Sequence, residues 1–339
     1  MSSILTISRF FRLLFLFLLF GNHLAFSQSD NNSEAVHEIT IYAMPTLYPL
    51  NWDNPATLYN SMKDCYFKTV LESDNYLLGH IAVSVNSPIL PKPLIIAMTS
   101  ADAQEKVNLV LKQKIGFGIL GATLKGRIER EDELLHKFEI YSKRKKLAFI
   151  TYRINEKAVR RILSFIDTYT RKNAAGTAPC NFYGGAFWPR YHNEGSGCWA
   201  FGMALLSTAN LLTAESEDWR IKVKIPINVI GGEYNHNKKI KYSLIRKTDE
   251  WYTGNGVENI DYVNNSVYDP SVIFNWIINQ RNATTLNMKP IEKDGVPGLL
   301  FDGRNILISE NDPLFQERKN PDLFIKRFQM KTNTANLNN

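Results

Sequence analysis

The sequence is poor in cysteine, and its N-terminal apolar run is too short to anchor the chain in a membrane. A spanning helix needs about 20 consecutive apolar residues. The stretch from Leu13 to Gly21 is shorter than this, and Asn22 and His23 interrupt it. We therefore predict no transmembrane span in the mature chain.

Motifs for several common chemistries are missing as well. The stretch from Gly116 to Gly126 holds four glycines but matches neither a Walker loop nor a dinucleotide fingerprint, so we interpret it as a turn-rich connection. No Gly-x-Ser-x-Gly elbow supports a serine hydrolase. Histidine, cysteine and carboxylate residues do not recur at the spacings of a metal site. The sequence thus indicates no cofactor and no bound metal.

A strong excess of one charge sign is also absent. The chain has 40 lysines and arginines against 33 acidic residues, which gives a net charge of +7. The basic residues are scattered except for one cluster, Lys143 to Lys146, which we expect at a solvated hairpin tip between strands 136–141 and 147–153. We therefore predict no nucleic-acid partner.

The N-terminus has the pattern of a cleavable secretory signal peptide. Arg9 and Arg12 precede the apolar run, and the small-residue exit Ala25-Phe26-Ser27 follows it. This pattern predicts removal of residues 1–27 and a mature protein that is exported to the periplasm or the extracellular space. No cysteine lies at the exit, so a lipid anchor is not indicated. The polar segments 28–37 and 331–339 are predicted to be disordered.

The three cysteines, Cys65, Cys180 and Cys198, bear on the chemistry because an exported protein meets an oxidising environment. An odd number leaves at least one thiol unpaired or bonded to another molecule. A bridge between Cys65 and Cys180 would leave Cys198 free. A bridge between Cys180 and Cys198 would abolish any thiol chemistry at Cys198, and the sequence does not decide between these pairings.

Periodicity and capping signals predict a fold of the α+β class. Asn155 and Asp269 stand at the expected starts of two helices. The predicted helices cover residues 55–70, a segment after Asp102, 156–170, 199–212 and 270–280. The predicted strands cover residues 38–43, 79–85, 93–99, 136–141, 147–153, 220–230 and 239–245, with a closing hairpin over 299–308.

Cys198 and His80 are the predicted catalytic residues. The stretch from Trp199 to Leu212 is apolar nearly all round, which predicts a helix buried at the centre of the domain, with Cys198 in its first turn. Unpaired N–H groups and the helix dipole at that turn lower a thiol pKa. His80 heads a predicted strand and could supply an imidazole. Taken singly, each residue is explained as well by a structural role, and the pairing is what makes them candidates.

The segment between Cys180 and Cys198 is rich in turn-forming and aromatic residues. Tyr183 and the N–H groups of Gly197 and Cys198 are candidate donors to an oxyanion. Trp188 and Tyr191 could form a wall for an acyl chain or a sugar, or simply a packed loop. His192 is a rival base, but its position favours a surface or lid role.

A strand headed by Gly79-His80, followed much later by a cysteine at the start of a buried apolar helix, resembles the circularly permuted branch of the NlpC-type papain-like superfamily. The resemblance covers residues 76–230. It implies an α+β, papain-like core in permuted order over residues 38–230, in which an antiparallel sheet packs on the Cys198 helix. Residues 231–330 would then form a C-terminal extension or cap.

The same resemblance implies a thiol amidase, peptidase or acyl transferase that acts on an envelope peptide or lipid. The family usually carries a polar residue on the strand after the histidine to orient the ring, and here the candidates are Thr99 and Ser100. Neither is the usual type of residue, so a second hypothesis is a catalytically silent envelope protein that uses the same cleft to bind a ligand or partner. The oligomeric state stays open.

Overall fold

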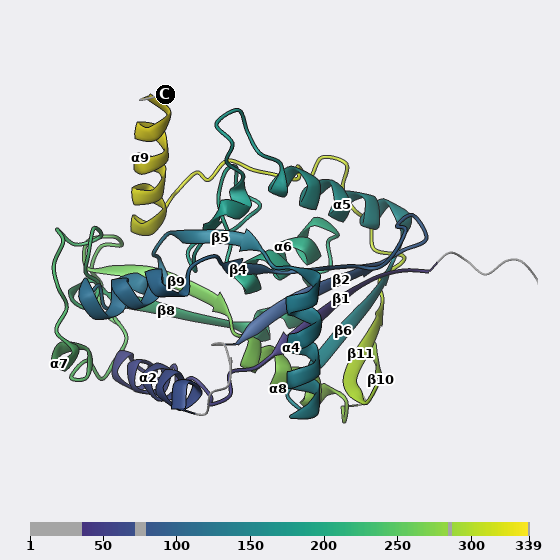
Figure 1. Cartoon of the computed structure of the whole chain (residues 1–339), viewed down its shortest axis with the longest axis horizontal. Helices are drawn as coiled ribbons and strands as arrows, with labels where there is room; N and C mark the ends of the chain where they lie inside the picture. The colour runs from purple at the N-terminus through teal and green to yellow at the C-terminus, as the bar shows by residue number, and fades with distance from the viewer. Residues whose placement is uncertain (1–35, 72–78, 284–286, 338–339) are drawn as a thin grey trace, which may run out of the picture. The chain divides into compact units, whose positions relative to one another are not determined.

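The computed structural model of the chain describes residues 36–71, 79–283 and 287–337 (Figure 1). The predicted signal peptide, residues 1–27, and most of the predicted lead-in lie outside these residues. His37, at the end of that lead-in, already belongs to the first strand, β1.

A six-stranded mixed sheet forms the centre of the fold, with the strand order β10-β11-β6-β1-β2-β3. Its strands are β1 (His37–Met44), β2 (His80–Asn86), β3 (Leu94–Ile96), β6 (Ala148–Ile154), β10 (Met288–Lys293) and β11 (Val296–Asp302). Neighbouring strands are antiparallel except β11 and β6, which are parallel. The sheet is therefore mixed, because the chain returns after residue 290 to add a parallel strand at the β6 edge.

Two smaller sheets extend this framework. One has the order β4-β5-β7, with β4 (Met98–Ser100), β5 (Leu124–Ile128) and β7 (Phe182–Tyr183). The other pairs β8 (Arg220–Pro226) with β9 (Tyr262–Tyr268). The strand predicted over residues 93–99 is thus broken at Ala97, and its two halves join different sheets.

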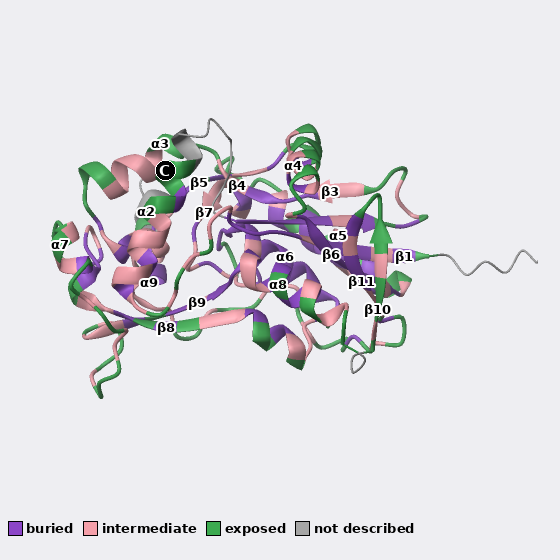
Figure 2. Cartoon of the chain, turned by 90° about the horizontal axis from the view of Figure 1, so that it is seen from below, coloured by how far each residue is buried: buried purple, intermediate pink, exposed green. Residues whose placement is uncertain are grey.

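Helices cover both faces of the central sheet. The α-helices of the described residues are α2 (Pro55–Leu71), α3 (Ala103–Val107), α4 (Glu131–Lys143), α5 (Glu156–Thr170), α6 (Cys198–Thr208), α7 (Tyr242–Ile245), α8 (Pro270–Gln280) and α9 (Leu323–Leu337), of which α2, α7 and α9 pack away from the central sheet. Helices α5 and α6 share a core with Ile39, Ile41 and Ile81. Helix α4 packs on the opposite face, where Leu134 meets Ala82. Figure 2 shows buried residues concentrated on β1 and β6, and most residues of β2 are buried as well.

Three secondary-structure predictions were wrong. Residues 136–141 belong to α4, because Leu134, Phe138 and Tyr141 recur at helical spacing and face a common cluster. The basic cluster 143–146 therefore lies at the C-terminal end of a helix and not at the tip of a hairpin. Residues 239–245 contain the short helix α7 instead of a strand.

The C-terminal hairpin was also placed wrongly, over residues 299–308. Its turn lies at Asp294-Gly295, where φ is 53° and 75°. A positive φ at both central residues of a two-residue turn is the conformation that an Asp-Gly pair favours. The tail predicted to be disordered from residue 331 is instead helical as far as Leu337, the end of α9.

Ion pairs tie the C-terminal segment, residues 303–322, to the loop that precedes α6. Arg190, which is 7% exposed, and Arg161 both bond Asp312, at 2.9 Å and 2.6 Å. Arg318 lies 2.5 Å from the carboxylate of Glu194, which is only 1% exposed. A charge this deeply buried is stable only when a partner compensates it. The loop before α6 is therefore anchored by residues more than a hundred positions later in the sequence.

Within the described ranges, no helix combines the length and the apolar character needed to cross a lipid bilayer.

Gly202 allows α6 to approach β2 closely. A Cβ at this position would lie 2.7 Å from Cγ2 of Ile81, a distance that real Cβ atoms essentially never show. We expect Gly202→Ala to lower the free energy of unfolding by about 1–3 kcal/mol, because it overpacks this contact. Urea denaturation monitored by circular dichroism measures the change.

The control is Gly176→Asn. Gly176 has a φ of 75° and open space around its Cα, and asparagine tolerates this conformation well. Its effect should stay within about 0.5 kcal/mol. Equal unfolding midpoints for Gly202→Ala and the unmodified protein would show that the helix and strand are not in tight contact.

Candidate active site

Cys198 is the first residue of α6 and lies at the buried centre of the fold. Gly197 is the N-cap of the helix, and most of the side chains along α6 are buried, as the apolar sequence predicts. Cys198 is 7% exposed and forms no disulfide. Cys180 is also a reduced thiol, and Cys65 is bridged to neither. The thiol is therefore chemically available, at a helix start where backbone N–H groups favour a negative charge.

His80 is the first residue of β2 and is 3% exposed. His80 and Cys198 interact electrostatically: His80 lowers the pKa of the Cys198 thiol, and Cys198 raises the pKa of the His80 ring. The structure thus brings together two residues that are more than a hundred positions apart in the sequence. The contact arises because α6 packs directly on β2, beside Gly202 and Ile81.

Glu129 holds the other side of the His80 ring. Nε2 of His80 donates to Oε2 of Glu129 at 2.7 Å, and this carboxylate is almost completely buried. The bond engages Nε2 and leaves Nδ1 as the nitrogen for the thiol. Lys137, on α4, forms an ion pair with the other oxygen of Glu129. The result is a series in which buried Cys198, His80 and Glu129 are followed by the half-buried Lys137.

Glu129 takes the orienting position for which the sequence had suggested Thr99 or Ser100. Thr99 pairs with Arg127 in the β4–β5 ladder, and the Ser100 hydroxyl donates to the backbone carbonyl of Asp102. Neither bonds His80 within the described part of the chain. Sequence reasoning missed Glu129 because it treated the preceding stretch as a turn-rich connection, whereas residues 124–128 form β5.

The backbone of β5 sets the position of Glu129. The backbone N–H of Glu129 donates to the carbonyl of Ala97 at 2.9 Å, and Ala97 lies between β3 and β4. The alternation in Leu124-Lys-Gly-Arg-Ile128 was the available signal for a strand that ends at a carboxylate.

Tyr183 lies at the thiol as well. It belongs to β7 and pairs with Leu124 of β5. Tyr183 interacts with Cys198, because it lowers the pKa of the thiol and the Cys198 charge raises the pKa of Tyr183. Nζ of Lys106 lies 4.9 Å from the centroid of the Tyr183 ring. An O–H donor and a cation therefore lie on the side of the sulfur where negative charge would collect.

The pKa shifts favour an ion pair between Cys198 and His80. Burial alone would raise the pKa of the Cys198 thiol, but the hydrogen bond and charge of His80, with smaller contributions from Ile81 and Tyr183, lower it below its usual value. Burial alone would lower the pKa of His80, yet its interactions with Cys198 and Glu129 raise it. The two opposite shifts favour a thiolate beside an imidazolium.

The neighbouring charged groups are consistent with this state. Burial would raise the pKa of Glu129, but His80 and Lys137 lower it, so the carboxylate stays ionised. Burial raises the pKa of Tyr183 well above its usual value, and the nearby Cys198 charge raises it further. Tyr183 therefore remains a neutral donor at physiological pH.

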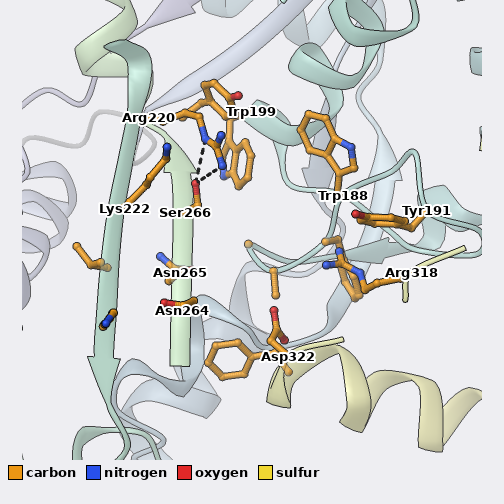
Figure 3. A pocket seen from close by; sticks show the side chains of 17 residues that line it. Trp188, Tyr191, Trp199, Arg220, Lys222, Asn264, Asn265, Ser266, Arg318 and Asp322 are labelled. Atoms are coloured by element: carbon orange, nitrogen blue, oxygen red, sulfur yellow. Dashed lines mark hydrogen bonds between the residues drawn. The ribbon is translucent and has the colours of Figure 1, made fainter. Parts of the chain in front are cut away.

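The predicted substrate-loop residues are separated by the structure. Trp188 and Tyr191 line a cavity of about 660 Å³, whose lining includes Trp199 but neither Cys198 nor His80 (Figure 3). His192 lies elsewhere: its N–H donates to the carbonyl of Gln316, and its ring centroid is 5.9 Å from that of Phe315. In the part of the chain that is described, His192 forms no hydrogen bond with Cys198.

Among the described residues, no three His, Cys, Asp or Glu side chains converge in a way that could hold a metal ion. The chain matches no family model, no curated protein and no solved structure.

Glu129 should tune the thiol through His80. In Glu129→Gln the imidazolium loses its carboxylate, so the pKa of His80 falls and the pKa of Cys198 rises. A shift of about one unit corresponds to about tenfold less thiolate at pH values below the thiol pKa. We therefore expect alkylation of Cys198 by iodoacetamide at about pH 6 to slow by about tenfold. The plot of alkylation rate against pH should shift to higher pH.

The control for this experiment is Glu133→Gln, which removes a carboxylate on α4 that pairs with Arg127 rather than with the histidine. Its alkylation profile should match that of the unmodified protein. A profile for Glu129→Gln that does not move relative to this control would disprove the coupling.

Proposed function

We propose that this protein is an exported cysteine-dependent amidase, peptidase or acyl transferase, with Cys198 as nucleophile and His80 as general base and acid. The observation that carries the proposal is the unbroken, buried connection from the Cys198 thiol through His80 to Glu129. A nucleophile, a base and a residue that orients the base are the three parts that such catalysis needs.

The reaction begins when the Cys198 thiolate attacks the carbonyl carbon of an amide or ester. The carbonyl π electrons move to oxygen, and the resulting oxyanion is stabilised by N–H groups at the start of α6 and by the Tyr183 hydroxyl. As the tetrahedral intermediate collapses, the imidazolium of His80 gives its proton to the departing amine or alcohol. The product of this half-reaction is a thioester on Cys198.

The second half-reaction releases the acyl group. Neutral His80 removes a proton from water, or from the hydroxyl or amine of another acceptor, as that molecule attacks the thioester. The C–S bond breaks, and the thiolate and imidazolium pair is restored. Glu129 stays ionised throughout and stabilises the charged ring, and Lys137 balances the buried carboxylate.

The family and the substrate class belong to the same proposal. The order of His80 before Cys198, with the histidine on a strand and the cysteine at the start of a buried helix, is that of the permuted NlpC-type papain-like proteins. By analogy with them, the substrate is an envelope peptide or lipid. The signal-peptide pattern of residues 1–27 supports export.

A catalytically silent binding protein is the second candidate. The enclosure of the thiol favours it, because Cys198 is 7% exposed and does not line the large cavity. Glu129 counts against it, because a buried carboxylate that orients the histidine is needed for catalysis and is not needed for a cleft that only binds a ligand or partner.

Hydrolysis of an activated ester, p-nitrophenyl acetate, distinguishes the two candidates. We expect an initial burst of nitrophenol equal to one equivalent of Cys198, and its complete loss in Cys198→Ala. His80→Asn should reduce the rate of acylation by about 10²–10⁴-fold, because the base is lost. The matched control, His192→Asn, changes a histidine outside the site and should leave the rate unchanged.

Alkylation by iodoacetamide gives a second measurement on the same variants. Cys180 is an internal reference, because burial raises the pKa of its thiol and it should react slowly. Equally slow reaction of Cys198 and Cys180, unaffected by His80→Asn, together with no burst, would support the binding protein and reject the enzyme.

A further inference from the structure

A second site lies in the large cavity, which the proposed reaction does not use. The β8–β9 ribbon forms one side, and Trp188, Tyr191 and Arg318 form another; Figure 3 shows Trp199 between them. The volume of about 660 Å³ is that of a cavity for a small molecule or for a few units of a polymer.

Strand β8 contributes a row of cations. Arg220, Lys222 and Lys224 alternate along the strand, so their side chains project from the same face. At about 3.3 Å per residue, the row extends over about 13 Å. Opposite them on β9 stand Tyr268, Ser266 and Asn264, in register. This arrangement fits an extended ligand with repeated negative charges better than it fits one compact anion.

Carboxylates offset part of this charge. Glu217 pairs with both Arg220 and Lys222, and Glu194 pairs with Arg318. Lys224 forms no ion pair within the described ranges; its ammonium lies 4.8 Å from the centroid of the Tyr262 ring.

Asp322 is the carboxylate that lines the cavity, and it accepts a hydrogen bond from the N–H of Ile325 at the start of α9. Burial raises its pKa, which weakens its repulsion of an anion.

The aromatic residues of the lining suit sugar rings. Trp188, Tyr191, Trp199 and Tyr268 come from three separate segments, and the rings of Trp199 and Tyr268 lie 5.7 Å apart with a tilt of 41°. Tyr268 is buried, and the guanidinium groups of Arg220 and Arg318 lie over the rings of Tyr268 and Tyr191. The half-buried indole rings of Trp188 and Trp199 can cover the apolar face of a sugar while neighbouring polar groups bind its hydroxyls.

Asn265 provides an independent sign of a missing ligand. It lines the cavity and is 8% exposed, and its buried Nδ2 has no hydrogen-bond partner in the described part of the chain. Buried donors in native proteins almost always have an acceptor, because an unpaired one carries the full cost of desolvation. A ligand oxygen in the cavity would supply that acceptor.

We propose that this cavity binds an acidic oligosaccharide, a short chain of sugar rings that carry carboxylates. The cation row pairs with the carboxylates, the indole rings cover the sugar faces, and Asn264, in register with Lys224, binds a hydroxyl or ring oxygen. Asn265 projects from the other face of β9, where it also lines the cavity and can bind a further oxygen. Nucleic acid fits less well, because three carboxylates stand among the cations and the net charge of the chain is small. This binding is independent of the Cys198 chemistry.

Trigalacturonate and a hyaluronan tetrasaccharide are suitable probes, and the fluorescence of Trp188 and Trp199 reports their binding. We expect saturable binding of at least one probe, with affinity at least tenfold weaker for the methyl-esterified form, which keeps the sugar rings and loses the charge. Lys224→Gln and Trp188→Phe should each weaken binding by at least threefold. Isothermal titration calorimetry repeats the measurement without relying on the tryptophans.

Matched controls separate this site from the rest of the molecule. Lys289→Gln removes an exposed cation on β10 and should not change binding, and Cys198→Ala should bind with unchanged affinity, so a failure of the proposed reaction leaves this result intact. The proposal is overturned if neither probe binds, if the esterified form binds equally well, or if Lys224→Gln and Lys289→Gln behave alike. Tighter binding of oligodeoxythymidylate or of anionic lipid vesicles would also overturn it.

Discussion

A buried thiol can ionise only if a positive charge lies against it, and in this protein His80 supplies that charge to Cys198. The same rule then applies to His80, because a buried imidazolium needs a negative partner, which is Glu129. Glu129 in turn is compensated by Lys137, whose side chain reaches toward solvent. Each charge in the series lowers the free-energy cost of burying its neighbour of opposite sign. The site therefore depends on all four residues being in place at once.

Four separate elements hold this series together. Strand β2 carries His80, the end of β5 carries Glu129, helix α4 carries Lys137, and helix α6 begins at Cys198. Helices α4 and α6 lie on opposite faces of the central sheet, so the series passes around the end of β2. His80 is the first residue of β2, at the end of the strand where it pairs with Met44, the last residue of β1.

The sequence predicted the elements with strong local signals. Asn155 and Asp269 mark the first turns of α5 and α8 by capping, and the apolar run after Cys198 predicted the buried helix α6. The pairing of His80 with Cys198 was a hypothesis from residue types and order, and the structure places the two side chains in contact. Local pattern sufficed for the helices because each of their signals lies within one element.

Other features could not be read from local pattern. Glu129 orients His80 only because β5 pairs with β4, and that pairing joins segments about 30 positions apart. Residues 136–141 mix apolar and polar positions in a way that fits a strand or a helix, and packing of Tyr141 and Leu134 decides for the helix. The parallel strand β11 returns to the sheet from the far end of the chain. Such non-local contacts leave no periodic signature.

The ion pairs of Arg190 and Glu194 with the C-terminal segment have a consequence for biosynthesis. A ribosome that makes the chain from its N-terminus delivers Asp312 and Arg318 more than a hundred residues after the loop that they hold. That loop leads directly into Cys198, so the surroundings of the thiol are completed only after residues 312–318 have emerged. A chain that ends before residue 310 keeps every residue of the series from Cys198 to Lys137, yet leaves two buried charges beside it without partners.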